Sequence, residues 1–288
     1  MTGRPNFDLQ SHSTHSDGAS APREVVARAA AAGVELLALS DHDTVDGVDE
    51  ALHAAPAEGI RVVPAAELSS LDGDREDIHV LGYGIDHRNA GLLDALRAFR
   101  ADRVARIGRM ADALRGIGFE VDLPDRGGAS VGRPHLAQAA FEHPANSMRL
   151  RDEGIVNSSL LLERYLIPGT PGYRRRSTPT VAEAIEVIHD AGGVAVWAHP
   201  FWNLDHDVEV LDTIDRFAAL GLDGVEAFYV THDERQTRLV AARCSELGLL
   251  TTGSADFHGP EHPRFNAFRN FEIYDLNPRL GPIPDRAK

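Results

Sequence analysis

The sequence is poor in the residues that form disulfide frameworks, cysteine-based metal sites and membrane spans. Its 288 residues include a single cysteine, Cys244, which excludes a disulfide framework and any zinc site built from several cysteines. No apolar run approaches the ~20 residues that a membrane-spanning helix requires. The opening segment, residues 1–6, is short and polar, unlike a secretory signal. We therefore expect a cytoplasmic protein that does not enter a membrane.

Basic residues are also in the minority. The chain has 29 Lys and Arg against 44 Asp and Glu, which gives a formal net charge of −15. This balance argues against the broad basic surface with which proteins hold DNA. It does not exclude a phosphorylated substrate, because bound divalent cations supply positive charge that the residue count omits.

Short apolar runs alternate with helical patterns in two parts of the chain. The first part has predicted strands at 7–12, 35–40, 60–66 and 78–85, and predicted helices at 22–32 and 45–55. The second has helices at 181–191, 208–219 and 233–247, and strands at 194–198, 224–229 and 249–254. This alternation is typical of a parallel sheet, since each crossover needs a helix to return the chain. About seven strands favour a barrel over an open sheet.

The region between these parts has no strand pattern. A long helical pattern covers residues 92–117, and further helical patterns follow a Gly- and Pro-rich stretch at 127–134. We therefore expect a barrel formed by residues 1–86 and 178–276. Residues 87–177 are expected to be a helical insertion that contributes to the substrate site, and residues 277–288 an irregular tail.

Side chains that bind metals recur at or near the ends of the predicted strands. They are His12, Asp17, His42, Glu67, His79, His199, Asp256 and His258. The loops after the carboxyl ends of parallel strands build the active sites of β/α barrels. Imidazole and carboxylate ligands suit Zn, Mn or Fe, and a carboxylate such as Glu67 can bridge two ions. Because such recurrence serves no structural purpose, we predict a site for two or three divalent cations.

Other residues near this set have simpler interpretations. Asp43 is most simply the N-cap of the helix that starts near Val45. His15 lies between two candidate ligands, and is either an exposed loop residue or a ligand of metal or substrate. The histidines with no expected role, in helical patterns or loops, are His53, His87, His143, His189, His206, His232 and His262.

Several separated motifs resemble those of the PHP (polymerase and histidinol phosphatase) superfamily. Residues 7–18, FDLQSHSTHSDG, resemble its opening motif. Later motifs follow in the same order: LSDHDT at 39–44, AE at 66–67, His79 with LGY at 81–83, AHP at 198–200 and SADFHG at 254–259. The resemblance covers Phe7 to about Pro260. It implies an α/β fold, namely a distorted seven-stranded (β/α)7 PHP-type barrel with an inserted helical subdomain and room for up to three metals.

The resemblance also implies roles for individual residues. It places His12, Glu67 and Asp256 on one metal, Glu67, His79 and His199 on a second, and Asp17, His42 and His258 on a third. The candidate catalytic residues among these ligands are Asp17, His42, Glu67, His199 and His258.

Gln10 departs from the pattern of the superfamily, whose opening motif usually has a histidine there. A glutamine offers only a neutral carbonyl oxygen, which is a weaker ligand than imidazole for Zn, Mn or Fe. The first metal is then held by the Gln10 oxygen, held by His15 instead, weakly bound, or of another kind. We keep Gln10 as a candidate ligand and expect the site to survive, because the other ligands of that ion remain.

The predicted insertion resembles one branch of the superfamily. GRPHLA at 132–137, YL at 165–166 and GTPGY at 169–173 are similar to motifs of the 3′,5′-nucleoside bisphosphate phosphatases, a branch that also trims RNA from its 5′ end. The resemblance implies that Arg133 and His135 bind phosphate. Their simpler interpretation is an arginine at a helix start and a surface histidine.

The predicted function is that of a metal-dependent phosphoesterase. It would hydrolyse a phosphate from 3′,5′-nucleoside bisphosphates, and 5′-terminal nucleotides of short RNA as a further substrate, through a hydroxide held between metals. Its expected partners are a phosphorylated nucleotide or short RNA. The alternatives are a phosphatase for a small metabolite such as histidinol phosphate, and a metal- and nucleotide-binding module without turnover.

Two further features leave alternatives open. Phe201 and Trp202 follow His199 directly, and either stack on a nucleobase or pack in the core or a lid. The run Arg174, Arg175 and Arg176 either meets a second phosphate or an RNA backbone, or is a solvated run of charge.

Overall fold

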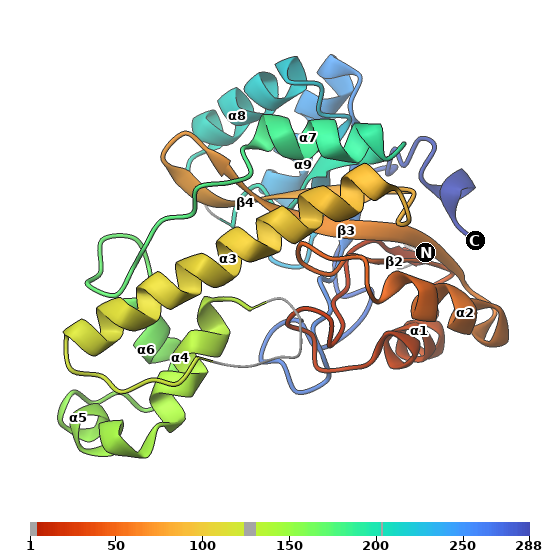
Figure 1. The fold of residues 1–288 in the computed structure, drawn as a ribbon. Helices are drawn as coiled ribbons and strands as arrows, with labels where there is room; N and C mark the ends of the chain where they lie inside the picture. The colour runs from red at the N-terminus through yellow and green to blue at the C-terminus, as the bar shows by residue number, and fades with distance from the viewer. Residues whose placement is uncertain (1–4, 124–130, 203) are drawn as a thin grey trace. The chain divides into compact units, whose positions relative to one another are not determined.

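The computed structural model describes residues 5–123, 131–202 and 204–288 (Figure 1). The chain divides into two compact units. The larger comprises Met1–Arg97 and Pro179–Lys288, and the smaller comprises Ala98–Thr178. Within the described ranges, no helix is long and apolar enough to cross a membrane.

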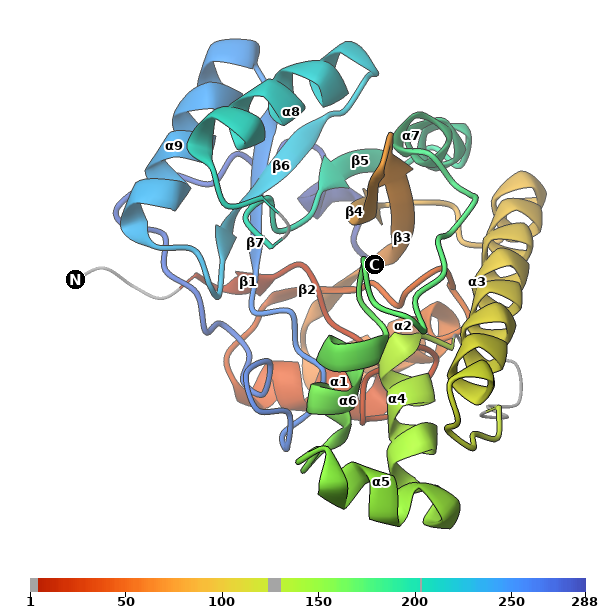
Figure 2. The same cartoon turned by 90° about the vertical axis from the view of Figure 1, so that its left-hand side faces the viewer.

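One seven-stranded sheet forms the centre of the larger unit. Its strands follow chain order: β1 (Phe7–Asp8), β2 (Leu36–Leu39), β3 (Arg61–Asp72), β4 (Arg75–Tyr83), β5 (Val194–Trp197), β6 (Gly224–Tyr229) and β7 (Leu250–Ser254). The first and last strands meet, because the N–H of Leu9 donates to the carbonyl of Gly253 at 3.2 Å. The sheet is thus a nearly closed barrel (Figure 2), which confirms the predicted seven-stranded α/β barrel.

Strand β4 runs antiparallel to both of its neighbours, β3 and β5. The other pairs are parallel. The expectation of a uniformly parallel sheet is therefore wrong at β4. Only Gly73 and Asp74 connect β3 to β4, and two residues allow a hairpin but no crossover helix. Gly73 takes a positive φ of 57°, which a glycine adopts without strain.

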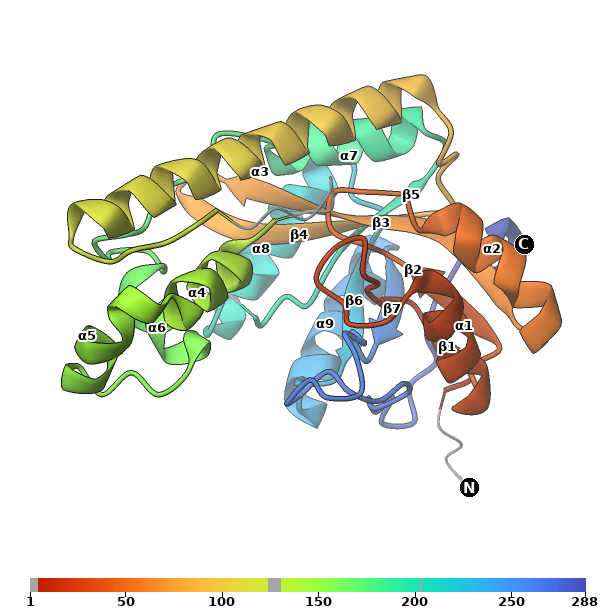
Figure 3. The same ribbon diagram turned by 60° about the horizontal axis from the view of Figure 1, so that its bottom comes forward.

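Helices cover the outside of the barrel (Figures 2 and 3). They are α1 (Pro22–Ala31), α2 (Val48–Glu58), α7 (Val181–Asp190), α8 (Asp207–Ala219) and α9 (Glu234–Leu247), with a short 3-10 helix η2 (Pro284–Arg286) near the end. In Figure 3, α1 and α2 lie side by side. Their apolar faces bury Val25, Ala51 and Ala55 against Leu37 and Val62 of the sheet. Each fully buried Val or Leu stabilises the fold by ~1.5–3 kcal/mol.

The described residues of the smaller unit form helices and loops around a separate core. Helix α3 (Ala90–Gly116) starts in the larger unit, and α4 (Arg133–Glu142), η1 (Pro144–Asn146), α5 (Ser147–Asp152) and α6 (Ser158–Tyr165) follow. The core includes Met110, Leu114, Phe119, Leu136 and Leu161. The buried Asn146 amide donates to two backbone carbonyls, those of Glu120 and Ala140, and ties η1 to this core.

Candidate metal centre

Hydrogen bonds between loops position several of the predicted ligands at the carboxyl ends of parallel strands. The carboxylate of Asp41, after β2, accepts hydrogen bonds at 2.6–2.7 Å from the backbone N–H of Ser13 and the hydroxyls of Ser13 and Ser16, after β1. The N–H of His12 donates to the carbonyl of Phe257, after β7, at 2.8 Å. The three loops therefore form one hydrogen-bonded frame.

Three acidic or imidazole residues at this end of the barrel have a positive φ. The values are 53° at Asp43, 32° at His199 and 53° at Asp256. For residues other than glycine such angles cost ~1–3 kcal/mol each, and they concentrate at functional sites. His199 follows β5 and Asp256 follows β7, so the strained residues lie directly after two strands of the barrel.

Asp43 is not the helix N-cap that the sequence suggested. Helix α2 begins later, at Val48 after Gly47. Asp43 is fully buried, and its Oδ1 accepts a hydrogen bond from the N–H of Ser69 at 3.0 Å. It braces β3 close to Glu67.

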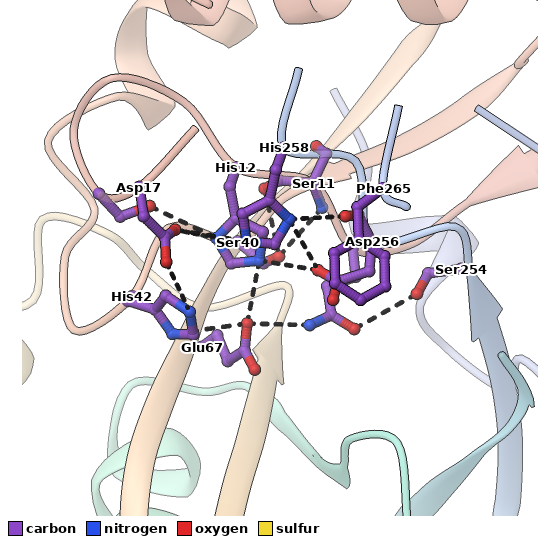
Figure 4. A network of polar contacts seen from close by, with 12 residues as sticks. Ser11, His12, Asp17, Ser40, His42, Glu67, Ser254, Asp256, His258 and Phe265 are labelled. Carbon is purple, nitrogen blue, oxygen red and sulfur yellow. Dashed lines mark hydrogen bonds and ion pairs between the residues drawn. The ribbon is translucent and has the colours of Figure 1, made fainter. Parts of the chain in front are cut away.

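All of the predicted His, Asp and Glu ligands come together at this end of the barrel. Three groups have ligand atoms within 4.8 Å of one another: His12, Asp17, His42 and His258; His42, Glu67 and His79; and His12, Glu67 and Asp256. His199 joins them, because its Nε2 lies 3.3 Å from Glu67 Oε1. Figure 4 shows His12 and His258 between Asp17 on one side and Asp256 on the other.

Several of these atoms are buried without a hydrogen bond. His12 Nε2 lies 3.1 Å from an oxygen of Glu67 and 3.1 Å from an oxygen of Asp256, but neither contact has hydrogen-bond geometry. Asp17 Oδ1, His42 Nδ1 and Asp256 Oδ1 are also buried without a hydrogen-bond partner. Because an unsatisfied buried polar group costs ~1–3 kcal/mol, their convergence fits a site that divalent cations complete.

The protonation of the acidic groups and of His42 suits cation binding. Burial raises the pKa of Asp256, but His258 and His12 together bring it down to about 2. Burial likewise raises the pKa of Glu67 and of Asp17, yet neighbouring imidazoles hold both well below their usual values. Burial lowers the pKa of His42 to about 3. At neutral pH these groups are in the forms that bind metals.

His12 differs from His42. Burial lowers its pKa, but the carboxylates of Asp256 and Glu67 outweigh burial and raise it well above the usual value. A cation that binds His12 must therefore displace a proton.

Known proteins are similar to this chain in both sequence and fold. Residues 8–128 match the PHP domain. A 3′,5′-nucleoside bisphosphate phosphatase of Chromobacterium violaceum is 33% identical over 88% of this chain and 88% of its own. A 5′-3′ exoribonuclease of Haemophilus influenzae is 33% identical over 88% of this chain and 90% of its own. The chain belongs to the PHP family.

Solved structures support this assignment. An amidohydrolase from Chromobacterium violaceum, with bound SO4 and no metal, has a TM-score of 0.82 at 29% identity and covers 99% of this chain and 98% of its own. A protein assigned as a metal-dependent phosphoesterase, from Bifidobacterium adolescentis, has a TM-score of 0.78 at 26% identity and covers 97% and 96%. The recognised family, the fold and the enzyme class are thereby confirmed. The chain is a metal-dependent phosphoesterase with candidate His, Asp and Glu clusters for cations.

Gln10 of this PHP enzyme is fully buried beside Glu67. Its Nε2 amino group donates to Glu67 Oε2 at 2.9 Å, and its Oε1 lies 3.3 Å from the Ser254 hydroxyl. That hydroxyl also lies 2.6 Å from Glu226 Oε1. The amide nitrogen, which cannot ligate a cation, thus faces Glu67 in this arrangement. A role for Gln10 as ligand stays a prediction.

One hydroxyl proton cannot serve both contacts of Ser254. Burial raises the pKa of Glu226 well above its usual value. A proton on Glu226 satisfies the whole chain, since Glu226 then donates to Ser254 and Ser254 donates to Gln10. The other Glu226 oxygen accepts the N–H of His199 at 2.9 Å, so this chain also fixes a predicted ligand.

Sequence analysis missed two residues of β6 that support the PHP site. Glu226 is one, and Tyr229 is the other: its hydroxyl donates to Asp256 Oδ2 at 2.8 Å. A gap in the strand-end pattern could have indicated them, because no site residue was proposed for the predicted strand at 224–229, which is β6. His232 also proved buried, against Phe201 and Tyr229, with ring centroids 5.3 and 5.4 Å away.

His15 and His262 lie near the centre but in different settings. His15 is half-buried and belongs to none of the three groups. The His262 ring lies 5.3 Å from that of His258 and stacks on Phe265 at 5.0 Å. Its Nδ1 accepts the N–H of Phe265 at 2.9 Å.

The predicted phosphate-binding residues lie in the smaller unit, at the start of α4. Arg133 is the first residue of this helix, and His135 Nδ1 accepts the N–H of Gly132 at 3.0 Å. Their binding of phosphate stays a prediction. The arginine run is not uniformly solvated, because Arg176 is buried with its Nε 3.9 Å from Asp102, whereas Arg174 is exposed and donates to its own segment.

Proposed function

We propose that this PHP phosphoesterase removes the 3′-phosphate from 3′,5′-nucleoside bisphosphates and also acts on 5′-terminal nucleotides of short RNA. The observation that carries the proposal is the position of Glu67. Its Oε1 faces His79 at 2.6 Å and His199 at 3.3 Å, and its Oε2 faces His12 at 3.1 Å. Such a carboxylate can bridge two cations. The relatives named as a nucleoside bisphosphate phosphatase and an exoribonuclease support the substrate class.

The proposed ligand sets are those that the family resemblance implies. His12, Glu67 and Asp256 would hold one cation, Glu67, His79 and His199 a second, and Asp17, His42 and His258 a third. The mixture of imidazole and carboxylate suits Zn, Mn or Fe. Bound cations would lower the pKa of a water toward 7 and offset the charge of the phosphate.

The protein's own groups orient these ligands. The Tyr229 hydroxyl donates a hydrogen bond to Asp256 Oδ2, and the other oxygen of this carboxylate, Oδ1, faces His12. Glu226 fixes the backbone of His199. Such supporting contacts typically change metal affinity 10–100-fold. Arg133 and His135 would bind phosphate, for which the paired N–H groups of a guanidinium are suited.

The test is phosphate release from adenosine 3′,5′-bisphosphate by protein reconstituted with Mn²⁺, with histidinol phosphate and AMP as parallel substrates. We expect release of the 3′-phosphate from the bisphosphate alone. Release from histidinol phosphate but not from the bisphosphate would replace the proposal with the small-metabolite alternative. Tight metal and nucleotide binding without release from any substrate would indicate a binding module.

A further inference from the structure

Trp202 is an exposed aromatic residue beside the candidate metal centre. Its exposed fraction is 46%, whereas the other tryptophan, Trp197 on β5, is 2% exposed and packs against Phe217. The backbone N–H of Trp202 donates to the backbone carbonyl of His199 at 2.9 Å, so a tight turn holds Trp202 next to that predicted ligand. Packing in the barrel core therefore does not account for Trp202.

The indole lies at the edge of the metal centre. Its ring centroid is 6.2 Å from that of His199 and 5.7 Å from that of Phe265, at interplanar angles of 66° and 50°. Neither ring lies parallel to the indole. A planar ligand can stack on a face that angled neighbours leave accessible.

Arg264 adds a positive charge above this surface. Its guanidinium carbon lies 5.7 Å from the centroid of the Trp202 ring, and its side chain is exposed. Among the described residues, no carboxylate forms an ion pair with Arg264. An exposed cation over an exposed indole stabilises the fold little by itself, so its placement fits a ligand that is both aromatic and anionic.

The segment that carries Arg264 is tied to the metal centre. The N–H of His258 donates to the carbonyl of Phe265 at 2.9 Å, and His262 Nδ1 accepts the N–H of Arg264 at 3.2 Å. Trp202 and Arg264 thus extend from two different predicted ligands, His199 and His258. Short backbone connections therefore hold both residues beside the candidate metal centre.

We propose that Trp202, with Arg264 over its ring, is the nucleobase subsite of this enzyme. The base stacks on the indole while the phosphate lies at the metal centre and the ribose spans the interval. This inference rests on the proposed function. Every base has a π-face, so stacking tolerates different bases. We expect purines to bind better than pyrimidines through their larger overlap, and adenine and guanine to bind alike.

The first test is the binding of AMP and of ribose 5-phosphate, which lacks a base, to the metal-loaded protein by calorimetry. Trp202→Ala is expected to weaken AMP binding roughly 5- to 100-fold, and Trp202→Phe should restore most of it. Binding of ribose 5-phosphate should be unchanged. Leu220→Ala, at the end of α8 with 48% exposure, is the matched control. Equal AMP affinity in Trp202→Ala, or an equal loss for both ligands, would overturn the subsite.

The second test uses the fluorescence of Trp202. Because the chain has only two tryptophans, the emission of the unaltered protein minus that of Trp202→Phe isolates the Trp202 signal without changing the buried Trp197. AMP should quench this signal and ribose 5-phosphate should not. A signal that AMP leaves unchanged at saturation would contradict stacking.

Turnover separates the failure of the subsite from the failure of the proposed function. If the unaltered enzyme releases phosphate from the bisphosphate and Trp202→Ala does so with the same KM, only the subsite is overturned. If the unaltered enzyme cleaves phosphate esters without a base and leaves nucleotides intact, the proposed function falls together with the subsite.

Discussion

Two groups of histidines and acids in the larger unit invite comparison. One is the candidate metal centre. The other is the flank pocket, a cavity of about 420 Å³ lined by Asp49, Leu52, His53, Asp86, His87, Arg88 and Lys288. In the flank pocket, His87 Nε2 lies 2.8 Å from Asp49 Oδ1, and Arg88 donates to the same oxygen at 2.8 Å. The Asp49 side chain is 50% exposed.

The difference lies in how the charges are satisfied. Hydrogen bonds from His87 and Arg88 lower the pKa of Asp49, so this carboxylate has its partners within the protein. His87 Nδ1 is the one atom of the pocket among the buried side-chain atoms that lack a hydrogen bond in the described part of the chain. In the metal centre such atoms converge from several strands. Residue types alone therefore do not separate the two groups, whereas convergent buried atoms without hydrogen bonds distinguish the candidate metal centre.

The largest expected effect comes from Glu67→Gln. The change keeps the shape of the side chain but removes the charge that would join two cations. We expect phosphate release to fall on the order of 10³-fold or more, together with a loss of bound metal measured by elemental analysis. Glu209→Gln, an exposed change on α8 with 44% side-chain exposure, is the control. A Glu67→Gln protein with full metal content and activity would show that this group does not hold the cations, and the contrast with the flank pocket would be lost.

The chain from Glu226 through Ser254 to Gln10 should have a smaller effect. Ser254→Ala removes the hydroxyl that orients the Gln10 amide, so we expect metal affinity to fall roughly 10–100-fold, as for other residues that support ligands. Gln10→His supplies an imidazole and should raise the affinity. Calorimetric titration of the metal-free protein with Mn²⁺ measures both. If Gln10→His binds Mn²⁺ more weakly than the unaltered protein, the hydrogen bond from Gln10 to Glu67 supports metal binding more than an imidazole ligand at this position does.

How much of this the sequence could predict depends on the range of the interactions. A strand followed by a residue such as His12, His42 or Asp256 is a local pattern that can be read from the sequence. The barrel could therefore be predicted, and the structure brings these residues together. The reversal at β4 could not be predicted, because the predicted strand ended at residue 66, whereas β3 continues to Asp72 and leaves only two residues before β4.

Other features depend on contacts between distant segments. His232 is buried by Phe201, 31 positions earlier, and nothing next to His232 in the sequence indicates this contact. Glu226 lies inside the apolar run of β6, and its role depends on Ser254 from the neighbouring strand. Asp43 resembled an N-cap locally, but the frame around Glu67 holds it in a left-handed conformation.

The pH dependence of metal stabilisation should distinguish the two groups further. His12 has a raised pKa, so its pairing with Asp256 and Glu67 stabilises the metal-free protein fully below pH 6.5 and is lost as the pH rises through the raised value. A bound cation replaces that proton. The increase in Tm on adding Mn²⁺ should therefore grow from pH 6 to 8, by about 2–4 °C per pH unit for one displaced proton.

The control for this titration is His53→Gln, an exposed change in the flank pocket that should leave the trend intact. A Tm increase that is the same at pH 6 and pH 8 would show that no proton leaves on metal binding.

The smallest effect is expected from Asp49→Asn in the flank pocket. The side chain is half exposed, so solvent screens its pairing with Arg88, and such pairs contribute ~0–1 kcal/mol. An asparagine oxygen can still accept the hydrogen bond from His87. We expect the free energy of unfolding, measured with urea, to fall by about 1 kcal/mol or less, with metal content and phosphate release unchanged. A loss of metal or activity comparable to that of Glu67→Gln would mean that the flank pocket is coupled to the catalytic site. The separation of the two groups by hydrogen-bond satisfaction would then be wrong.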